Sequence, residues 1–141
     1  DPAAKKDSLL AEAAPARPVG ARLDRQIWFE AAEARRAWPG GPPKAARWIG
    51  QLEPRFSEDY TLVVYTNGGA RLWIDGQLVL DAWEKGGKRF AKPVALKSGV
   101  RVPIKLEWKR LEKAPEMHLS WESASQAIEH VPPAYLYPPG K

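Results

Sequence analysis

The sequence predicts an all-β fold, a two-sheet antiparallel β-sandwich of the jelly-roll-like barrel type. About eight short apolar runs follow one another along the 141 residues, and turn residues separate them. The 14 Pro residues disfavour long helices and suit short strands joined by rigid loops. Val100–Arg110 alternates apolar and polar residues, which is the period of a half-buried strand.

Domain boundaries are predicted from composition. Residues 1–20 are rich in Ala and Pro, which is typical of a linker or flexible tail, with a fragment of helix expected at Ser8–Ala14. The folded domain is expected over residues 21–137, followed by a C-terminal tail at 138–141. A linker of this kind indicates one module of a longer chain.

The first candidate strand is Gln26–Glu30, and the Pro- and Gly-rich residues 31–47 are expected to be mostly loop. Tyr60–Thr66 carries bulky residues on both faces, which favours a central strand. Pro93 cannot donate to a ladder, so its strand is expected near an edge. The further expected extended segments are Arg47–Leu52, Tyr60–Thr66, Arg71–Ile74, Gln77–Asp81, Phe90–Leu96, Val100–Arg110, the run from Met117 to Glu122, and Val131–Tyr137.

Turn chemistry in residues 60–83 predicts a β-meander. Asn67-Gly68-Gly69 is expected to reverse the chain through positive φ angles. Asp75-Gly76 is a strong two-residue hairpin signal.

Alternation and aromatic content predict the core. The expected inward residues are Val100, Val102, Ile104, Leu106 and Trp108, together with Trp48, Met117, Leu119 and Trp121. The expected outward residues are Arg101, Lys105, Glu107 and Lys109. Trp73 lies on the face opposite Leu72 and Ile74, where core packing beneath a loop is favoured over ligand stacking.

Composition excludes several classes of function. The chain has no Cys, so disulfides and thiolate chemistry are absent, and no apolar run reaches the roughly 20 residues of a membrane span. The net charge is +5, and the basic residues between Lys85 and Arg110 are interpreted as solvated strand faces in preference to a groove for a polyanion. No nucleic-acid motif is found. His118 and His130 have no partner spacing typical of a catalytic triad, so this domain is not expected to be an enzyme, although its parent protein can be one.

An ordered set of short segments resembles the protective-antigen type (PA-14) domain family. The resemblance covers about Arg47 to Tyr137, and each segment alone is weak. The segments are Trp48-Ile49-Gly50, Tyr60-Thr61-Leu62, Gly69-Ala70-Arg71-Leu72-Trp73-Ile74-Asp75-Gly76, Leu80-Asp81-Ala82-Trp83, Leu96-Lys97-Ser98-Gly99, Ile104-Lys105-Leu106-Glu107-Trp108, Leu119-Ser120-Trp121, Val131-Pro132-Pro133 and Leu136-Tyr137.

The resemblance implies a β-sandwich module that is usually attached to other domains. In the adhesin branch of the family, a calcium ion held by two adjacent Asp residues binds glycans. Asn67 and Gly68 stand at those positions here, so neither a calcium cofactor nor another metal site is expected. A third possibility is calcium held by Asp75, Asp81 and backbone carbonyls, although these residues fit better as a turn residue and a strand-end residue.

The preferred functional hypothesis is a non-catalytic module that binds a glycan or polysaccharide without calcium. The candidate ligand-binding residues are Trp38, Asn67, Trp83, Lys85 and Lys88. The alternative is an architectural or protein–protein interaction domain with no sugar site. Both hypotheses place the domain in a larger secreted or surface protein of bacteria, in the extracellular space or cell envelope, as the family resemblance implies.

Overall fold

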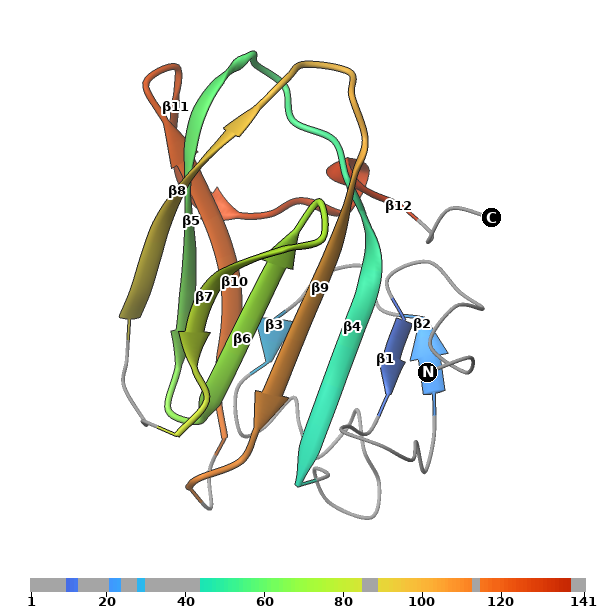
Figure 1. Ribbon diagram of the computed structural model, residues 1–141, viewed down its shortest axis with the longest axis vertical. Coiled ribbons are helices and arrows are strands. Elements are labelled where there is room, and N and C mark those ends of the chain that lie inside the picture. The colour runs from blue at the N-terminus through green and yellow to red at the C-terminus, as the bar shows by residue number, and fades with distance from the viewer. Residues whose placement is uncertain are drawn as a thin grey trace.

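The computed structural model is a sandwich of two antiparallel sheets, and it describes residues 10–12, 21–23, 28–29, 44–84, 89–112 and 115–137 (Figure 1). The first sheet has the order β2 (Ala21–Leu23), β1 (Leu10–Glu12), β4 (Ala45–Leu52), β9 (Val102–Lys109), β6 (Gly69–Ile74) and β7 (Gln77–Ala82), and β12 (Leu136–Tyr137) also pairs with β4. The second sheet has the order β11 (Gln126–His130), β10 (Met117–Ser123), β5 (Glu58–Thr66) and β8 (Arg89–Leu96), and β3 (Trp28–Phe29) also pairs with β10. A short 3₁₀ helix, η2 (Pro133–Tyr135), precedes β12.

The core lies between the sheets and is filled by the alternate residues of their inner faces. Trp48, Trp108 and Trp121 are each at most 1% exposed, which confirms their prediction as core residues. In β9, Ile104, Leu106 and Trp108 join the core cluster, as the alternation predicts. The predicted position of Val100 is wrong, because it precedes the strand and is 48% exposed.

Several local predictions are confirmed. Asp75 and Gly76 both have positive φ, 53° and 79°, as a two-residue turn between β6 and β7 requires. β5 is central, because it pairs with β10 on one side and β8 on the other. β8, which contains Pro93, lies at the end of the described order of its sheet.

The predicted meander is wrong at its first connection. β5 and β6 lie in different sheets, so the bend at Asn67–Gly69 carries the chain from one layer to the other. Gly68 and Gly69 are not among the described residues with positive φ. Their glycine character is instead required by close approach of other atoms.

Other segments differ from expectation at the edges of the fold. The predicted helical fragment at Ser8–Ala14 is wrong where the structure describes it, because Leu10–Glu12 forms β1 and pairs with β4. β4 begins at Ala45, inside the segment expected to be mostly loop. β11 and η2 were not expected, whereas the domain boundaries remain predictions. No helix in the described ranges is long and apolar enough to cross a membrane.

Candidate functional site

The bend between β5 and β6 is fixed by hydrogen bonds to the start of β10. The hydroxyl of Thr66 donates to the carbonyl oxygen of Glu116 at 2.8 Å and accepts from the Gly68 N–H at 2.9 Å. The side-chain oxygen of Asn67 accepts from the Glu116 N–H at 3.1 Å. The side chains of Thr66 and Asn67 therefore satisfy both backbone groups of Glu116. Asn67, a predicted ligand-binding residue, connects the bend to the residue that precedes β10.

Gly68 has no room for a side chain. A Cβ atom added there would lie 2.5 Å from Nε1 of Trp108 and would clash with the carbonyl oxygen of Lys109. The second carboxylate that the family resemblance implies for a calcium site therefore cannot be accommodated at this position. Because Asn67 contributes a neutral oxygen that already accepts a hydrogen bond, the residues of this corner do not fit a calcium ion.

Asp75 and Asp81 do not provide a substitute calcium site. Asp75 lies in the turn before β7 and Asp81 lies near the end of that strand, so about 13 Å of strand, from Gln77 to Asp81, separates them. Asp81 accepts from the Trp83 N–H at 3.3 Å, which agrees with its predicted local role. Within the residues described, no group of three or more His, Cys, Asp or Glu side chains is arranged to hold a metal ion.

Trp83 lies against the bend and lines a hollow of about 410 Å³. A Cβ atom at Gly69 would clash with the Trp83 carbonyl oxygen, so the second glycine permits this contact. The Arg71 guanidinium lies 4.4 Å from the centroid of the Trp83 ring, and the Lys109 ammonium lies 5.1 Å from it. The residues that line the hollow are Arg71, Asp81, Ala82, Trp83, Glu84 and Phe90.

A row of alternating charges crosses the outer face of the first sheet beside this hollow. The register places Arg47 of β4, Glu107 of β9, Arg71 of β6 and Asp81 of β7 in one line. Glu107 pairs with Arg47 at 3.9 Å and with Arg71 at 3.5 Å, and Arg71 pairs with Asp81 at 3.5 Å. Glu107 was expected to face water but is 8% exposed, because the row and its surroundings cover it.

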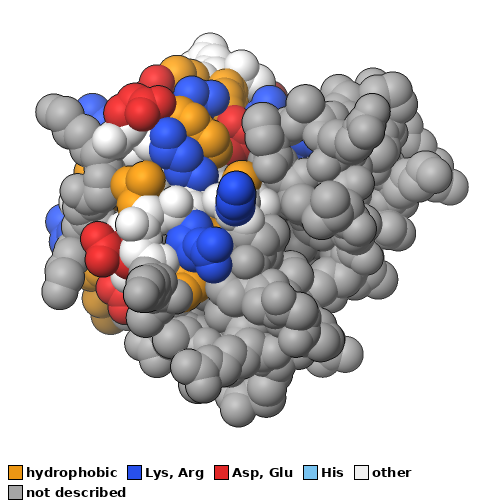
Figure 2. All heavy atoms as spheres, turned by 90° about the horizontal axis from the view of Figure 1, so that it is seen from below, with side chains coloured by type: hydrophobic (Ala, Val, Ile, Leu, Met, Phe, Trp, Pro, Cys, Tyr) orange, Lys and Arg blue, Asp and Glu red, His pale blue; other side chains and the backbone are white. Residues whose placement is uncertain are grey.

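Among the residues that the structure describes, the charges of this row and of the neighbouring pair of Lys109 and Glu84 balance. Lys109 pairs with Glu84 at 3.2 Å, which adds one further cation and one further anion to the row. The described groups are three cations, Arg47, Arg71 and Lys109, and three anions, Glu107, Asp81 and Glu84. Figure 2 views the molecule from the end where β9 and β7 finish, and it shows basic side chains between hydrophobic and acidic ones.

The predicted site is placed only in part. Asn67 lies in the bend and the Trp83 backbone lies against Gly69 of the same bend, but the described contacts include none between the two side chains, and Trp38, Lys85 and Lys88 lie outside the described residues. Trp73 is not in the core cluster, contrary to the favoured prediction. It is half-buried on the outer face, with the Lys105 ammonium 4.1 Å from its ring centroid.

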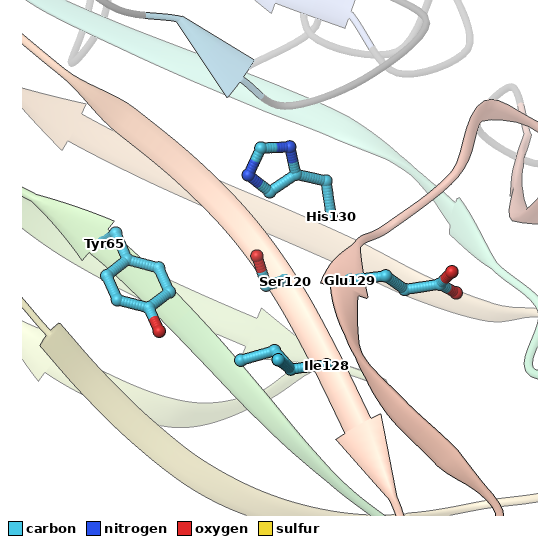
Figure 3. A pocket seen from close by; sticks show the side chains of 5 residues that line it. All are labelled: Tyr65, Ser120, Ile128, Glu129 and His130. Atoms are coloured by element: carbon cyan, nitrogen blue, oxygen red, sulfur yellow. The ribbon is translucent and has the colours of Figure 1, made fainter.

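A separate hollow of about 310 Å³ lies on the second sheet, lined by Tyr65, Ser120, Ile128, Glu129 and His130 (Figure 3). His118 stands beside it, its ring centroid 4.9 Å from that of His130 in an edge-to-face arrangement. Ser120 and His130 are register partners, but no hydrogen bond between their side chains is found among the described contacts. Sequence reasoning missed this cluster because the register of β10 against the unexpected β11 creates it.

Comparisons with known proteins agree with this architecture. A model of the PA14 domain family matches residues 39–134. The anti-sigma-I factor RsgI3 of Acetivibrio thermocellus is 38% identical over 95 residues, which are 67% of this chain and 15% of that protein. A solved anti-sigma factor domain-containing protein is 32% identical with a TM-score of 0.84, over 96% of this chain and 49% of its own.

A more distant structure shares the fold alone. The epithelial adhesin 9 A domain of Candida glabrata, solved in complex with Galβ1-3GlcNAc, is 8% identical with a TM-score of 0.71, over 94% of this chain and 88% of its own. The present chain thus spans a small part of its curated relative and about half of the solved anti-sigma chain. The family model covers more than half of the chain and includes the bend, the hairpin and the central strands. The chain belongs to the PA14 domain family.

Proposed function

We propose that this domain is a non-catalytic glycan-binding module that works without calcium and holds its ligand in the Trp83 hollow. The observation that carries the proposal is a half-buried Trp ring in a hollow whose lining also includes one guanidinium, Arg71, and two carboxylates, Asp81 and Glu84. An indole ring stacks on the apolar face of a sugar, and the carboxylates and guanidinium beside it accept and donate hydrogen bonds to hydroxyl groups.

The remaining predicted contacts belong to the same proposal. Lys85 and Lys88 follow Trp83 in sequence, and Trp38 supplies a further aromatic ring. Asn67 acts as a brace for the corner, because its oxygen accepts from Glu116. The Candida adhesin complex supports the general idea that this architecture can carry a sugar site.

The likeness to anti-sigma proteins supports a sensory setting. In this proposal the module belongs to a longer protein of the cell envelope, and it reports an extracellular polysaccharide to a part of that protein outside the present chain. Catalysis is not part of the proposed role.

A second candidate function is protein–protein interaction with no sugar site. The hollow on the second sheet favours it, because Ile128 is 44% exposed there beside Tyr65 and His130. A hollow that combines an aliphatic side chain, an aromatic ring and polar groups can receive a side chain of a partner protein.

Replacement of Trp83 by Ala tests the proposal. We expect W83A to weaken binding to the best ligand of a polysaccharide panel by about tenfold or more, because a ring at the centre of a small site carries much of the affinity. Isothermal titration in the presence of EDTA measures the affinity, and the chelator should leave it unchanged.

The matched control is Y65A, which removes an aromatic ring from the other hollow. Tyr65, like Trp83, has an arginine over its ring, Arg89 at 6.0 Å. Loss of binding in Y65A but not in W83A would move the site to the second sheet. Absence of binding to every polysaccharide at millimolar concentration would favour the protein-interaction function.

A further inference from the structure

The outer face of β9, together with Arg101 just before the strand, carries a regular pattern of cations over aromatic rings. Arg101, Lys105 and Lys109 follow one another at intervals of four residues, so at about 3.3 Å per residue each is about 13 Å from the next along the chain. Their charged groups lie 3.6 Å, 4.1 Å and 5.1 Å from the ring centroids of Tyr137, Trp73 and Trp83, respectively. The three aromatic residues come from three different segments, so the fold lines up what the sequence separates.

We call each cation with the aromatic ring beneath it a station. Two of the three stations have hollows beside them. The Trp83 hollow lies at the Lys109 end, and a second one of about 250 Å³ lies at Lys105. The second is lined by Ile49, Trp73, Gly76, Pro103, Ile104 and Lys105. Register pairs Lys105 with Trp73 in the same way as it pairs Glu107 with Arg71, so both hollows open on the outer face. A single sugar unit does not span this separation, whereas a chain laid along β9 does.

The middle station differs from the outer two in charge. Lys109 is paired with Glu84 at 3.2 Å, and Arg101 is paired with Glu53 at 3.0 Å. No carboxylate in the described ranges forms an ion pair with Lys105, whose ammonium lies over the Trp73 ring. An uncompensated positive charge next to an apolar hollow attracts an anion attached to a ring-like apolar body.

We propose that β9 forms a binding strip for an extended acidic polysaccharide, with a carboxylate-bearing sugar at Trp73 and Lys105 and a further sugar of the same chain at Trp83. This rests on the proposed function and deepens it by naming the class of ligand. Trp73 and the apolar hollow contact the sugar ring, and Lys105 contacts its carboxylate. Contacts at both stations on one chain raise the affinity together, so longer chains bind more tightly than short ones.

The middle station is tested by removing the carboxylates of the ligand and, separately, the charge of Lys105. The probes are polygalacturonate, polymannuronate and glucuronoxylan, each compared with its carboxyl-reduced, neutral form. We expect at least one polyuronate to bind more tightly than its reduced form. K105Q should weaken that polyuronate about threefold, the effect of one exposed ion pair, and should abolish its advantage over the reduced form.

The matched control is K92Q, which removes the same charge from the exposed Lys92 of β8 in the other sheet. It should leave the preference for the polyuronate intact. W73A tests the apolar half of the station, and we expect it to weaken a hexamer about tenfold while affecting a dimer little, because the dimer binds at Trp83 alone. Unchanged unfolding midpoints of all variants confirm that the fold is preserved.

Different failures are distinguishable. Equal effects of K105Q and K92Q would overturn the strip, because binding would then follow net charge alone. Binding of a neutral glycan that depends on Trp83 but not on Trp73 or chain length would overturn it while the proposed function stands. Binding of poly-glutamate as tight as that of the best polyuronate, with the same loss in K105Q, would replace the polysaccharide with an acidic peptide. If no glycan binds, the proposed function and the strip both fail.

Discussion

Gly68 decides what the family's metal-binding corner can do in this chain. The indole nitrogen of Trp108 and the carbonyl of Lys109 occupy the space into which a side chain would extend. Neighbouring Asn67 uses its oxygen to hold Glu116. Two causes thus prevent calcium binding at this corner: the two carboxylates are missing, and the packing around Gly68 leaves no room for a side chain. Restoring the carboxylates would not remove the second obstacle.

Substitution of Gly68 by Asp should destabilise the fold without restoring calcium binding. We expect G68D to lower the free energy of unfolding by about 3 kcal/mol, because the added atoms overpack the corner. N67D is the matched control and should cost less, because a carboxylate oxygen can still accept from Glu116. Urea denaturation with and without millimolar calcium measures both effects. A calcium-dependent rise in the stability of the double variant N67D/G68D would contradict the packing argument.

The substitutions at the corner are readable from sequence, but their structural cause is not. The loss of the two carboxylates was predicted from the residue types of Asn67 and Gly68, at the positions where the family resemblance implies an Asp pair. The close approach of Trp108 depends on β9 lying beside β6, a contact between residues about 40 positions apart. Positive φ was the wrong explanation for Gly68, because glycine in a bend can also serve the close approach of neighbouring atoms.

Individual strands are held to one another by side chains as well as by ladders. The carboxylate of Glu58 in β5 accepts from the Ser123 hydroxyl at 2.6 Å and from the backbone N–H and hydroxyl of Ser125, both at 3.0 Å. It thereby fixes the turn between β10 and β11. The hydrogen bond from Ser123, followed by those from Ser125, lowers the pKa of Glu58 from its ordinary value of about 4.5.

This lowered pKa predicts the pH dependence of the turn. A carboxylate with a lowered folded-state pKa stabilises the fold above its ordinary pKa, and the contribution is lost as pH falls through the folded value. At pH 7, E58Q should therefore unfold at a lower urea concentration than wild type. The difference should shrink steadily below about pH 4.5. E122Q on neighbouring β10 is the control, and an equal pH-dependent difference there would contradict a specific role of Glu58.

The strands were easier to predict than their arrangement. The alternation in β9 identifies Ile104, Leu106 and Trp108 because periodicity depends only on neighbours in sequence. It does not identify Glu107 as buried, since its two arginine partners come from β4 and β6. The same alternation is compatible with a hairpin or with a change of sheet at the bend, which is why the predicted meander failed between β5 and β6.

At the scale of the whole molecule, the C-terminal segment closes one end of the sandwich. The Tyr135 ring lies 5.8 Å from that of Trp121, which lies 4.8 Å from that of Tyr60 in the core. Nε of Arg55 donates to the Tyr135 hydroxyl at 2.7 Å, and its guanidinium lies 4.7 Å from the ring centroid. The Tyr135 side chain thus connects the aromatic core residues Tyr60 and Trp121 to Arg55 at the surface.

Removal of the Tyr135 ring should weaken the whole fold. We expect Y135A to lower the free energy of unfolding by about 2 kcal/mol, because it uncovers the edge of the Trp121 ring. Y137A is the control, since Tyr137 contacts Arg101 on the outer face and is not part of the core cluster. Chemical denaturation of both variants measures the effects, and an equal or larger loss in Y137A would contradict a closing role for Tyr135.

The buried Glu107 between Arg47 and Arg71 has an evolutionary consequence. The side chains of Arg47 and Glu107 are only 8% and 10% exposed, so loss of either partner leaves a charge with little water around it. We therefore expect single replacements at these positions to cost more stability than combined ones. Among related domains, Arg47, Arg71 and Glu107 should therefore vary together. A sequence that lacks the glutamate should also lack one of the two arginines.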